Sequence, residues 1–136
     1  MNTASSLLTN LTDQQRAAVE PASGVLLVRA GAGSGKTRVI THRIAYLVQH
    51  HGVDPRSIVA LTFTNKAARE MRERIAHLLG PYGELPYVGT FHGYCLRLLK
   101  SEGQRINLPP MTLLDDDDQE KLMKSILARI NAPKQY

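Results

Sequence analysis

The sequence is poor in several features, and each scarcity excludes a class of protein. A single cysteine, Cys95, stands among 136 residues, so an internal disulfide cannot form and a reducing compartment is favoured. No apolar run approaches the roughly 20 residues that a membrane-spanning helix requires, and residues 1–10 lack the basic region and apolar core of a secretory signal. We therefore expect a cytoplasmic protein with no membrane partner. Cys95 lies in an apolar helical stretch, where we expect a small buried hydrophobe.

The net charge of the chain is modest and positive. A formal value of +5 permits an anionic partner such as nucleic acid or a nucleotide, without proving one. The hydrophobic content of 43% and the charged content of 21% are typical of a soluble globular protein. Positive and negative side chains alternate between Lys66 and Arg74, which predicts a solvated helix face with i,i+4 ion pairs.

One stretch combines glycines, a lysine and a hydroxyl in a phosphate-binding pattern, Ala30 to Thr37 (Ala-Gly-Ala-Gly-Ser-Gly-Lys-Thr). It follows an apolar run at 25–28 and precedes a segment with helical periodicity, the context that this pattern requires. Glycines let backbone N–H groups approach a phosphate chain, Lys36 is placed to reach the outer phosphates, and the Thr37 hydroxyl can coordinate Mg²⁺. The following helix adds its positive dipole end. Ala30 stands where the pattern usually has its first glycine.

Short apolar runs alternate with helical stripes along most of the chain. The pattern predicts strands at 24–29 and 57–63, and a third within 86–93 that is followed by a turn. The predicted helices lie at about 11–19, 36–49, 66–79 and 94–102, with a last one after 114. This order predicts an α/β fold in which a parallel sheet is flanked by helices. The carboxyl ends of its strands would place 30–37 and 63–66 on one edge, where such folds bind ligands.

The acidic run at 115–118 and the apolar residues before it resemble a metal-binding strand. The stretch Met111–Asp116 has the outline of a Walker B strand, in which an acid after an apolar run holds Mg²⁺. Pro109 and Pro110 come directly before it, where a central strand should begin. The acids at 115–118 also open an amphipathic helix, where capping and the dipole favour negative charge. We therefore interpret them as helix-capping residues.

Gln15 has a structural interpretation of its own. It lies three residues after Thr12, which is the spacing of a capping box at the start of a helix. From the residues alone, capping is the preferred role.

Four blocks, taken together, carry a family resemblance. They are Gln15-Arg16, Ala30 to Arg38, Thr62 to Ala68 with Glu70-Met71-Arg72, and Gly89 to Gly93. In order and spacing they resemble the superfamily 1 DNA helicases of the UvrD, Rep and PcrA type, across nearly the whole chain. The phosphate loop is shared with many unrelated NTPases, whereas the two later blocks are far more specific.

The resemblance implies an ATP site and replaces the capping role of Gln15 with one in reading the adenine edge. Lys36 and Thr37 are then the catalytic residues, with Mg²⁺ on the Thr37 hydroxyl and Arg38 as the next member of the site. The implied ATP-binding residues are Gln15, Ala30, Gly31, Ala32, Gly33, Ser34, Gly35, Lys36, Thr37 and Arg38.

The resemblance also implies contacts with single-stranded DNA and with its junctions to duplex DNA. An aromatic ring can stack on a base, while Asn and Lys can meet phosphates. For any two aromatics at strand ends, ordinary core packing is the preferred alternative, and only the flanking residues favour DNA here. The implied DNA-binding residues are Phe63, Thr64, Asn65, Lys66, Thr90, Phe91 and His92.

By resemblance, 1–90 is the start of a RecA-like P-loop motor domain and 91–136 the start of an inserted helical subdomain. The parent protein is then an ATP-dependent 3′-to-5′ DNA helicase, a hydrolase in DNA repair or replication that can have accessory partners. The Walker B acids and the arginines of a second motor domain have no counterpart in the sequence, so we expect an inactive fragment. A helicase–nuclease of the RecB or AddA type and a non-catalytic nucleic-acid-binding module remain alternatives.

Overall fold

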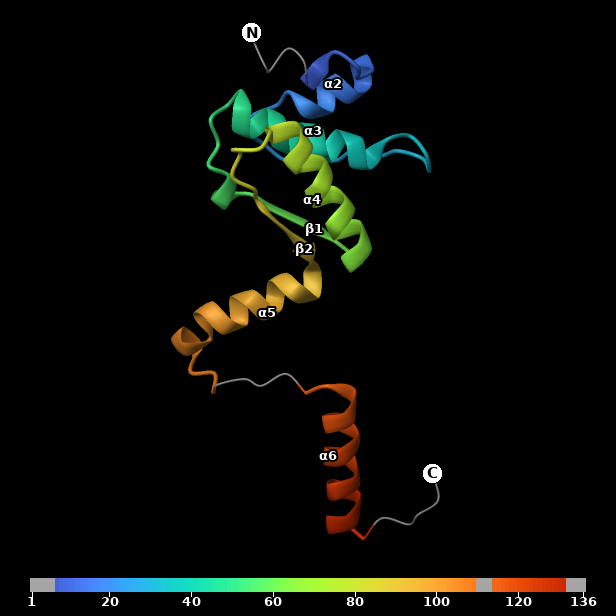
Figure 1. Cartoon of the computed structure of the whole chain (residues 1–136), viewed down its shortest axis with the longest axis vertical. Coiled ribbons are helices and arrows are strands. Elements are labelled where there is room, and N and C mark those ends of the chain that lie inside the picture. Colours follow the sequence, from blue (N-terminus) through green and yellow to red (C-terminus); the bar gives the residue numbers. More distant parts are fainter. Residues whose placement is uncertain (1–6, 110–113, 132–136) are drawn as a thin grey trace. The chain divides into compact units, whose positions relative to one another are not determined.

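The computed structural model describes residues 7–109 and 114–131. The chain divides into two units, one ending at Leu96 and the other beginning at Arg97. The first unit contains α2 (Asp13–Val19), α3 (Lys36–Gln49), η1 (Pro55–Ser57), β1 (Val59–Thr62), α4 (Asn65–Leu79) and β2 (Tyr87–Thr90). The division falls within α5 (Phe91–Glu102), and the second unit also contains η2 (Gly103–Ile106) and α6 (Asp116–Arg129) (Figure 1).

A parallel βαβ unit forms the centre of the first unit, as the sequence predicts. Strands β1 and β2 pair from Val59 opposite Tyr87 to Thr62 opposite Thr90. Helix α4 joins them and lies against both strands (Figure 1). Arg72 on α4 donates a hydrogen bond to the carbonyl oxygen of Val88 in β2. The two strands therefore end at one edge, and each leads directly into a helix.

The first predicted strand, 24–29, is not a strand in the structure. The sheet of the described residues contains β1 and β2 alone, so this segment has no neighbour with which to exchange backbone hydrogen bonds. Its side chains alternate in exposure: Val25 104%, Leu26 44%, Leu27 82% and Val28 43%. Leu26 and Val28 face α3, with Val39 and Ile40 across a cavity of about 260 Å³. A continuous apolar run is typical of a strand buried on both faces of a parallel sheet, so both the strand and its burial are wrongly predicted here.

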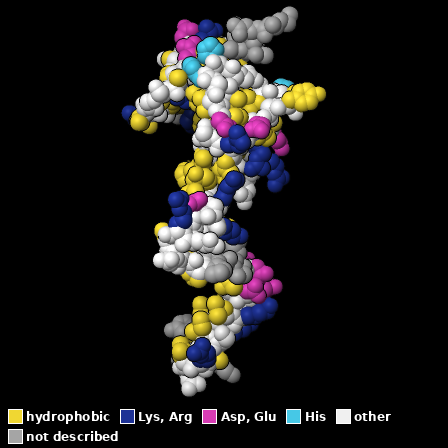
Figure 2. Space-filling model, turned by 90° about the vertical axis from the view of Figure 1, so that its left-hand side faces the viewer, with side chains coloured by type: hydrophobic (Ala, Val, Ile, Leu, Met, Phe, Trp, Pro, Cys, Tyr) yellow, Lys and Arg dark blue, Asp and Glu magenta, His cyan; other side chains and the backbone are white. Residues whose placement is uncertain are grey.

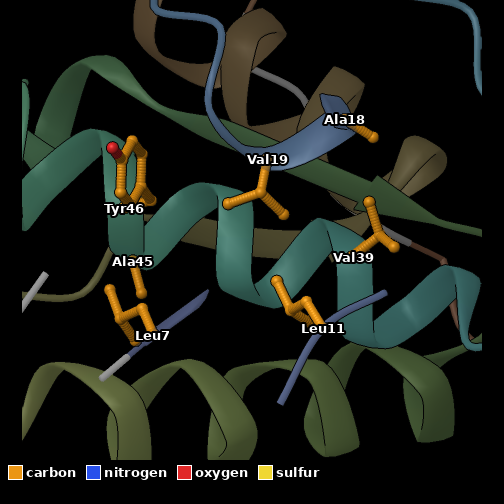
Figure 3. Close-up of a cluster of buried hydrophobic side chains, with 7 residues drawn as sticks. All are labelled: Leu7, Leu11, Ala18, Val19, Val39, Ala45 and Tyr46. Carbon is orange, nitrogen blue, oxygen red and sulfur yellow. The ribbon is translucent and has the colours of Figure 1, made fainter. Parts of the chain in front are cut away.

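Two apolar clusters hold the first unit together on either side of α3. One joins α2 to α3, and Figure 3 shows Val19 lying over α3 between Tyr46 and Val39. The other packs Ile44 of α3 against Met71 and Ile75 of α4 and against Val88 of β2. Leu79 contacts both clusters. Helix α3 is therefore the element on which the others assemble.

Helix boundaries in the first unit follow local signals. Helix α3 has the predicted bounds. Thr64 caps α4 by accepting a hydrogen bond from the N–H of Ala67 at 3.1 Å, and Gly80, at φ +82°, ends that helix. The predicted turn after β2 is wrong, because α5 begins at Phe91, directly after the strand. The Thr90 hydroxyl accepts from the N–H of Gly93 at 3.1 Å, so capping starts the helix without a turn.

Three other expectations have different outcomes. The ion pairs predicted on α4 do not form: within the described ranges, ion pairs occur elsewhere, for example between Lys124 and Glu120 on α6. Cys95 is exposed rather than buried, and α5 as a whole has no buried residue. The capping role of the acidic run is confirmed, since the Asp115 carboxylate accepts from the N–H of Asp118 at 2.8 Å. Residues 110–113, which include the start of the Walker B-like stretch, lie outside the residues that the structure describes.

Helix α6 has apolar side chains, but none of its residues is buried. Figure 2 shows hydrophobic side chains of this helix open at the surface, beside the acidic group at its start. In the described parts of the chain, no helix combines the length and apolar character needed to cross a membrane.

Candidate nucleotide site and nucleic-acid interface

The glycine-rich loop delivers the chain into the start of α3. Gly33 and Gly35 adopt φ values of +73° and +84°, a region that favours glycine. The first turn of α3 has neither a side-chain cap nor an acidic residue. Backbone N–H groups at the start of a helix lack intrahelical partners, and the dipole end there is positive. The loop therefore provides an uncapped, electropositive helix start that suits a phosphate group.

Lys36 lies over the loop that precedes it. Its Nζ donates to the carbonyl oxygens of Ala30 at 2.9 Å and Gly31 at 2.5 Å. The hydroxyl of Ser34 donates to the Gly31 carbonyl at 2.6 Å. Thr37 follows at the first turn of the helix, exposed and with no hydrogen bond from its hydroxyl to any described residue. The cation and a free hydroxyl thus stand together at the helix start.

Gln15 performs the capping role and also contacts the phosphate loop. Its Oε1 accepts from the N–H of Thr12 at 3.1 Å, and its own N–H donates to the Thr12 hydroxyl at 3.3 Å. Its Nε2 donates to the carbonyl oxygen of Ser34 at 3.3 Å. A Cβ built on Gly35 would lie 3.0 Å from that nitrogen. The capping box is therefore confirmed, and the same side chain lies beside the loop.

A cavity of about 680 Å³ opens between α2, the 25–29 segment and the loop. Of the predicted ATP-site residues it gathers Gln15, Ala30, Gly31, Ser34 and Lys36. Its lining among the described residues is Thr12, Gln14, Gln15, Ala17, Ala18, Leu26, Leu27, Val28, Arg29, Ala30, Gly31, Ser34, Lys36 and Val39. The volume is of the size that holds a small-molecule ligand. The lining contains two cations, Arg29 and Lys36, and two carboxamides, Gln14 and Gln15, but no carboxylate.

Arg38 lies apart from that cavity. With Arg74 and His77 it lines a groove of about 400 Å³ between α3 and α4. Sequence spacing places Arg38 beside Thr37, but successive residues of a helix point in different directions. The structure therefore separates Arg38 from the cavity that gathers Gln15 and Lys36.

The edge where β1 and β2 end carries an exposed pair of aromatic rings. Phe63 follows β1 and Phe91 follows β2, and their ring centroids are 5.4 Å apart with a 43° angle between the planes. Phe63 is 88% exposed and Phe91 45% exposed. Core packing therefore does not explain these phenylalanines.

The residues that flank the aromatic pair divide into two groups. The hydroxyl oxygens of Thr64 and Thr90 cap the helices that begin there, so each already accepts a hydrogen bond from the backbone. Asn65, Lys66 and His92 are exposed. They have no side-chain hydrogen bond or ion pair with any described residue. An amide and a cation are thus free beside two exposed rings.

No group of three or more His, Cys, Asp or Glu side chains could hold a metal ion within the described ranges. The metal ligand predicted from the sequence, the Thr37 hydroxyl, lies in the first turn of α3, directly after the loop. Magnesium commonly binds through few protein ligands together with substrate phosphates.

One residue of this region was missed by the sequence patterns. Arg43 on α3 donates from Nη1 to the carbonyl oxygens of Ala18 at 3.0 Å and Val19 at 3.4 Å, at the end of α2. A signal exists, because Arg43 interrupts the i,i+4 series of apolar residues from Val39 to Leu47. A charged residue in an inward-facing series must have a polar partner, and here the partner is a helix end.

A glycine-rich loop that opens a helix, in a chain with a parallel βαβ unit, is an arrangement found in nucleotide-binding α/β proteins. Residues 11–136 match the family described as UvrD/REP helicase N-terminal domain. The chain belongs to that family.

Curated relatives agree with this assignment. The chain is 46% identical over 126 residues to the ATP-dependent DNA helicase PcrA of Staphylococcus aureus (strain Mu50 / ATCC 700699), covering 92% of this chain and 17% of the relative. It is 45% identical, over the same number of residues and with the same coverage, to the protein of the same name from Staphylococcus epidermidis (strain ATCC 12228 / FDA PCI 1200). The chain therefore spans about a sixth of the length of these relatives.

Proposed function

We propose that the chain is part of an ATP-dependent DNA helicase that translocates 3′ to 5′ on single-stranded DNA and unwinds duplexes. The observation that carries this proposal is the exposed Phe63–Phe91 pair at the edge where both strands end. Family membership and the phosphate loop support it. A cytoplasmic role in DNA repair or replication, with accessory partners, is part of the same proposal.

The loop residues fit a nucleotide with Mg²⁺. Backbone N–H groups from Ala30 to Gly35 and the start of α3 would hold the phosphates, with Lys36 beside them. Thr37 would hold the ion. The Gln15 carboxamide can pair with adenine through an acceptor and a donor, once it exchanges its present partners for the base. A bound ATP–Mg²⁺ supplies the phosphoryl group whose transfer drives movement, and the residues of this chain position and charge-stabilise it.

The aromatic edge fits single-stranded DNA. Bases can stack on the rings of Phe63 and Phe91, while Asn65, Lys66 and His92 are placed to meet the backbone. The rings are sequence-tolerant partners because every base presents a π face. This is the contact that a motor needs, since it must bind any sequence it traverses.

The domain division is part of the proposal. Residues 1–90 would belong to a RecA-like motor domain and 91–136 to an inserted helical subdomain. The exposed side chains of Val25 and Leu27 and the apolar side chains of α6 agree with elements that pack against further parts of a larger protein.

The test is an ATPase assay on the 136-residue chain, with and without single-stranded DNA. We expect weak nucleotide binding at best and no turnover, because the described lining of the cavity holds no carboxylate to complete a Mg²⁺ site. Lys36→Ala is the control for the loop. Robust DNA-stimulated turnover that Lys36→Ala abolishes would contradict the predicted inactivity.

The lack of a carboxylate in the described lining also favours a second candidate, a non-catalytic nucleic-acid-binding module. Nucleotide titration with and without Mg²⁺ separates the two. A motor fragment should bind ATP more tightly with Mg²⁺ and lose binding in Lys36→Ala. A module that has lost catalysis should bind DNA and ignore ATP.

A further inference from the structure

Helix α2 is too short to be stable without contacts to the rest of the chain. It has seven residues, fewer than an isolated helix needs to be stable in water. Its carboxyl end also needs partners, because the last carbonyl groups of a helix have none within the helix. Pro21 follows directly after the cap residue Glu20 and has no N–H to offer. The position of α2 therefore depends on bonds from its neighbours.

Arg43 of α3 supplies those bonds. Its half-buried guanidinium donates to two adjacent carbonyl oxygens, those of Ala18 and Val19. A cation at this place is favourable, because the carboxyl end of a helix carries the negative end of the dipole. His51, just beyond α3, adds a ring nitrogen 3.0 Å from the carbonyl oxygen of Glu20.

Apolar contacts alone do not fix the register of α2 on α3. Figure 3 shows Ala18 and Val19 above α3, near Val39. The hydrophobic effect is non-directional, so such contacts tolerate small rotations and shifts. Hydrogen bonds weaken steeply with misalignment. Two of them from one guanidinium therefore determine how α2 is rotated on α3.

The other end of α2 carries Gln15 to the phosphate loop with little clearance. Its Nε2 is 3.3 Å from the carbonyl oxygen of Ser34, and a Cβ on Gly35 would lie 3.0 Å away. A rotation or shift of α2 therefore moves the Gln15 carboxamide relative to the loop.

We propose that Arg43 is a positioning residue for base selectivity: by fixing α2 on α3, it sets where the Gln15 carboxamide stands beside the nucleotide cavity. This inference rests on the proposed role of Gln15 in reading adenine. Arg43 acts through Gln15, so its removal affects recognition of the base and leaves recognition of the phosphates unchanged.

The experiment measures binding of ATP, GTP and inorganic tripolyphosphate to the 136-residue chain with Mg²⁺, by competition against a fluorescent ATP analogue. Arg43→Met keeps an unbranched apolar stem and removes every donor. We expect it to lower the preference for ATP over GTP about tenfold, the effect of misplacing one hydrogen-bonding group. Tripolyphosphate affinity should change less than about twofold. Arg43→Lys, which keeps the charge and one donor group, should restore part of the preference.

Gln15→Ala separates this inference from the proposed function. If Gln15→Ala removes the ATP preference and Arg43→Met does not, Arg43 has no positioning role. An equal loss of all three ligands in Arg43→Met likewise overturns the inference, because it shows general destabilisation. If the unmodified chain shows no preference for ATP over GTP, the inference fails while the proposed helicase function stands, because only weak binding is expected of this chain. If Gln15→Ala keeps the full preference for ATP, the proposed adenine role is wrong and the inference fails with it.

Discussion

Gly35 satisfies two requirements at the junction of the phosphate loop and α3. Its φ of +84° lies in the left-handed region, and a Cβ there would approach Gln15 Nε2 to 3.0 Å. Gly31, in the same loop, has no positive φ and has open space around its Cβ position. Gly31 and Gly35 look equivalent in sequence, yet of these two only Gly35 has a backbone conformation that favours glycine.

We predict that Gly35→Ala destabilises the chain by about 1–2 kcal/mol, the cost of left-handed backbone for an L-residue. Gly31→Ala is the matched control and should stay within about 0.5 kcal/mol. Urea denaturation followed by circular dichroism measures both. Equal stability of the two variants would show that the loop conformation is wrong.

Individual residues show how much of the site could be predicted from the sequence. The proximity of Gln15 to the phosphate loop cannot be predicted from local patterns, since Ser34 lies 19 positions after Gln15 in the sequence. Spacing reveals its capping role, and only the family resemblance points to the nucleotide. Arg43 was missed because its partners are backbone carbonyls, which carry no sequence signal of their own. Arg38 shows the opposite case: it follows Thr37 directly in the sequence, yet it lines the groove between α3 and α4 and not the nucleotide cavity.

Among the elements, helices were predicted more accurately than strands. Helix α3 has the predicted bounds and α4 begins one residue earlier than expected, because capping and apolar periodicity are local properties. A strand requires a partner that can lie anywhere in the chain. Segment 57–63 finds one in β2, whereas 24–29 finds none among the described residues. The same kind of apolar run therefore gives a strand in one case and an exposed extended segment in the other.

The start of helix α6 provides a test of local capping. Asp115→Ala removes the carboxylate that accepts from the N–H of Asp118, which should cost the helix about 1 kcal/mol. Asp117→Ala removes an equal charge from the first turn with no capping bond, and should cost about half of that or less. Carbon chemical shifts of α6 measure the helical population. A larger loss in Asp117→Ala than in Asp115→Ala would exclude the capping role.

For the molecule as a whole, the net charge and the exposed side chains both favour a nucleic-acid partner. The net charge of +5 is compatible with a nucleic-acid partner. On α4, exposed Lys66, Arg69 and Arg74 form no ion pair with any described residue, so they remain available to phosphates. The aromatic edge lies at the start of that same helix. We therefore propose that DNA contacts this edge, with bases stacked on the rings and phosphates toward α4.

Binding of single-stranded DNA to the 136-residue chain, followed by fluorescence anisotropy of a labelled oligothymidine, is the decisive test of the proposed contact at the Phe63–Phe91 edge. Phe63→Ala removes the most exposed ring of the pair and should weaken binding about tenfold, since stacking of a base on an aromatic ring contributes about 1–3 kcal/mol. Tyr82→Ala removes an equally open ring elsewhere, 99% exposed, and should leave binding unchanged. We predict this contrast between the two variants. Equal binding by the unmodified chain and Phe63→Ala, or no binding by the unmodified chain, would contradict it.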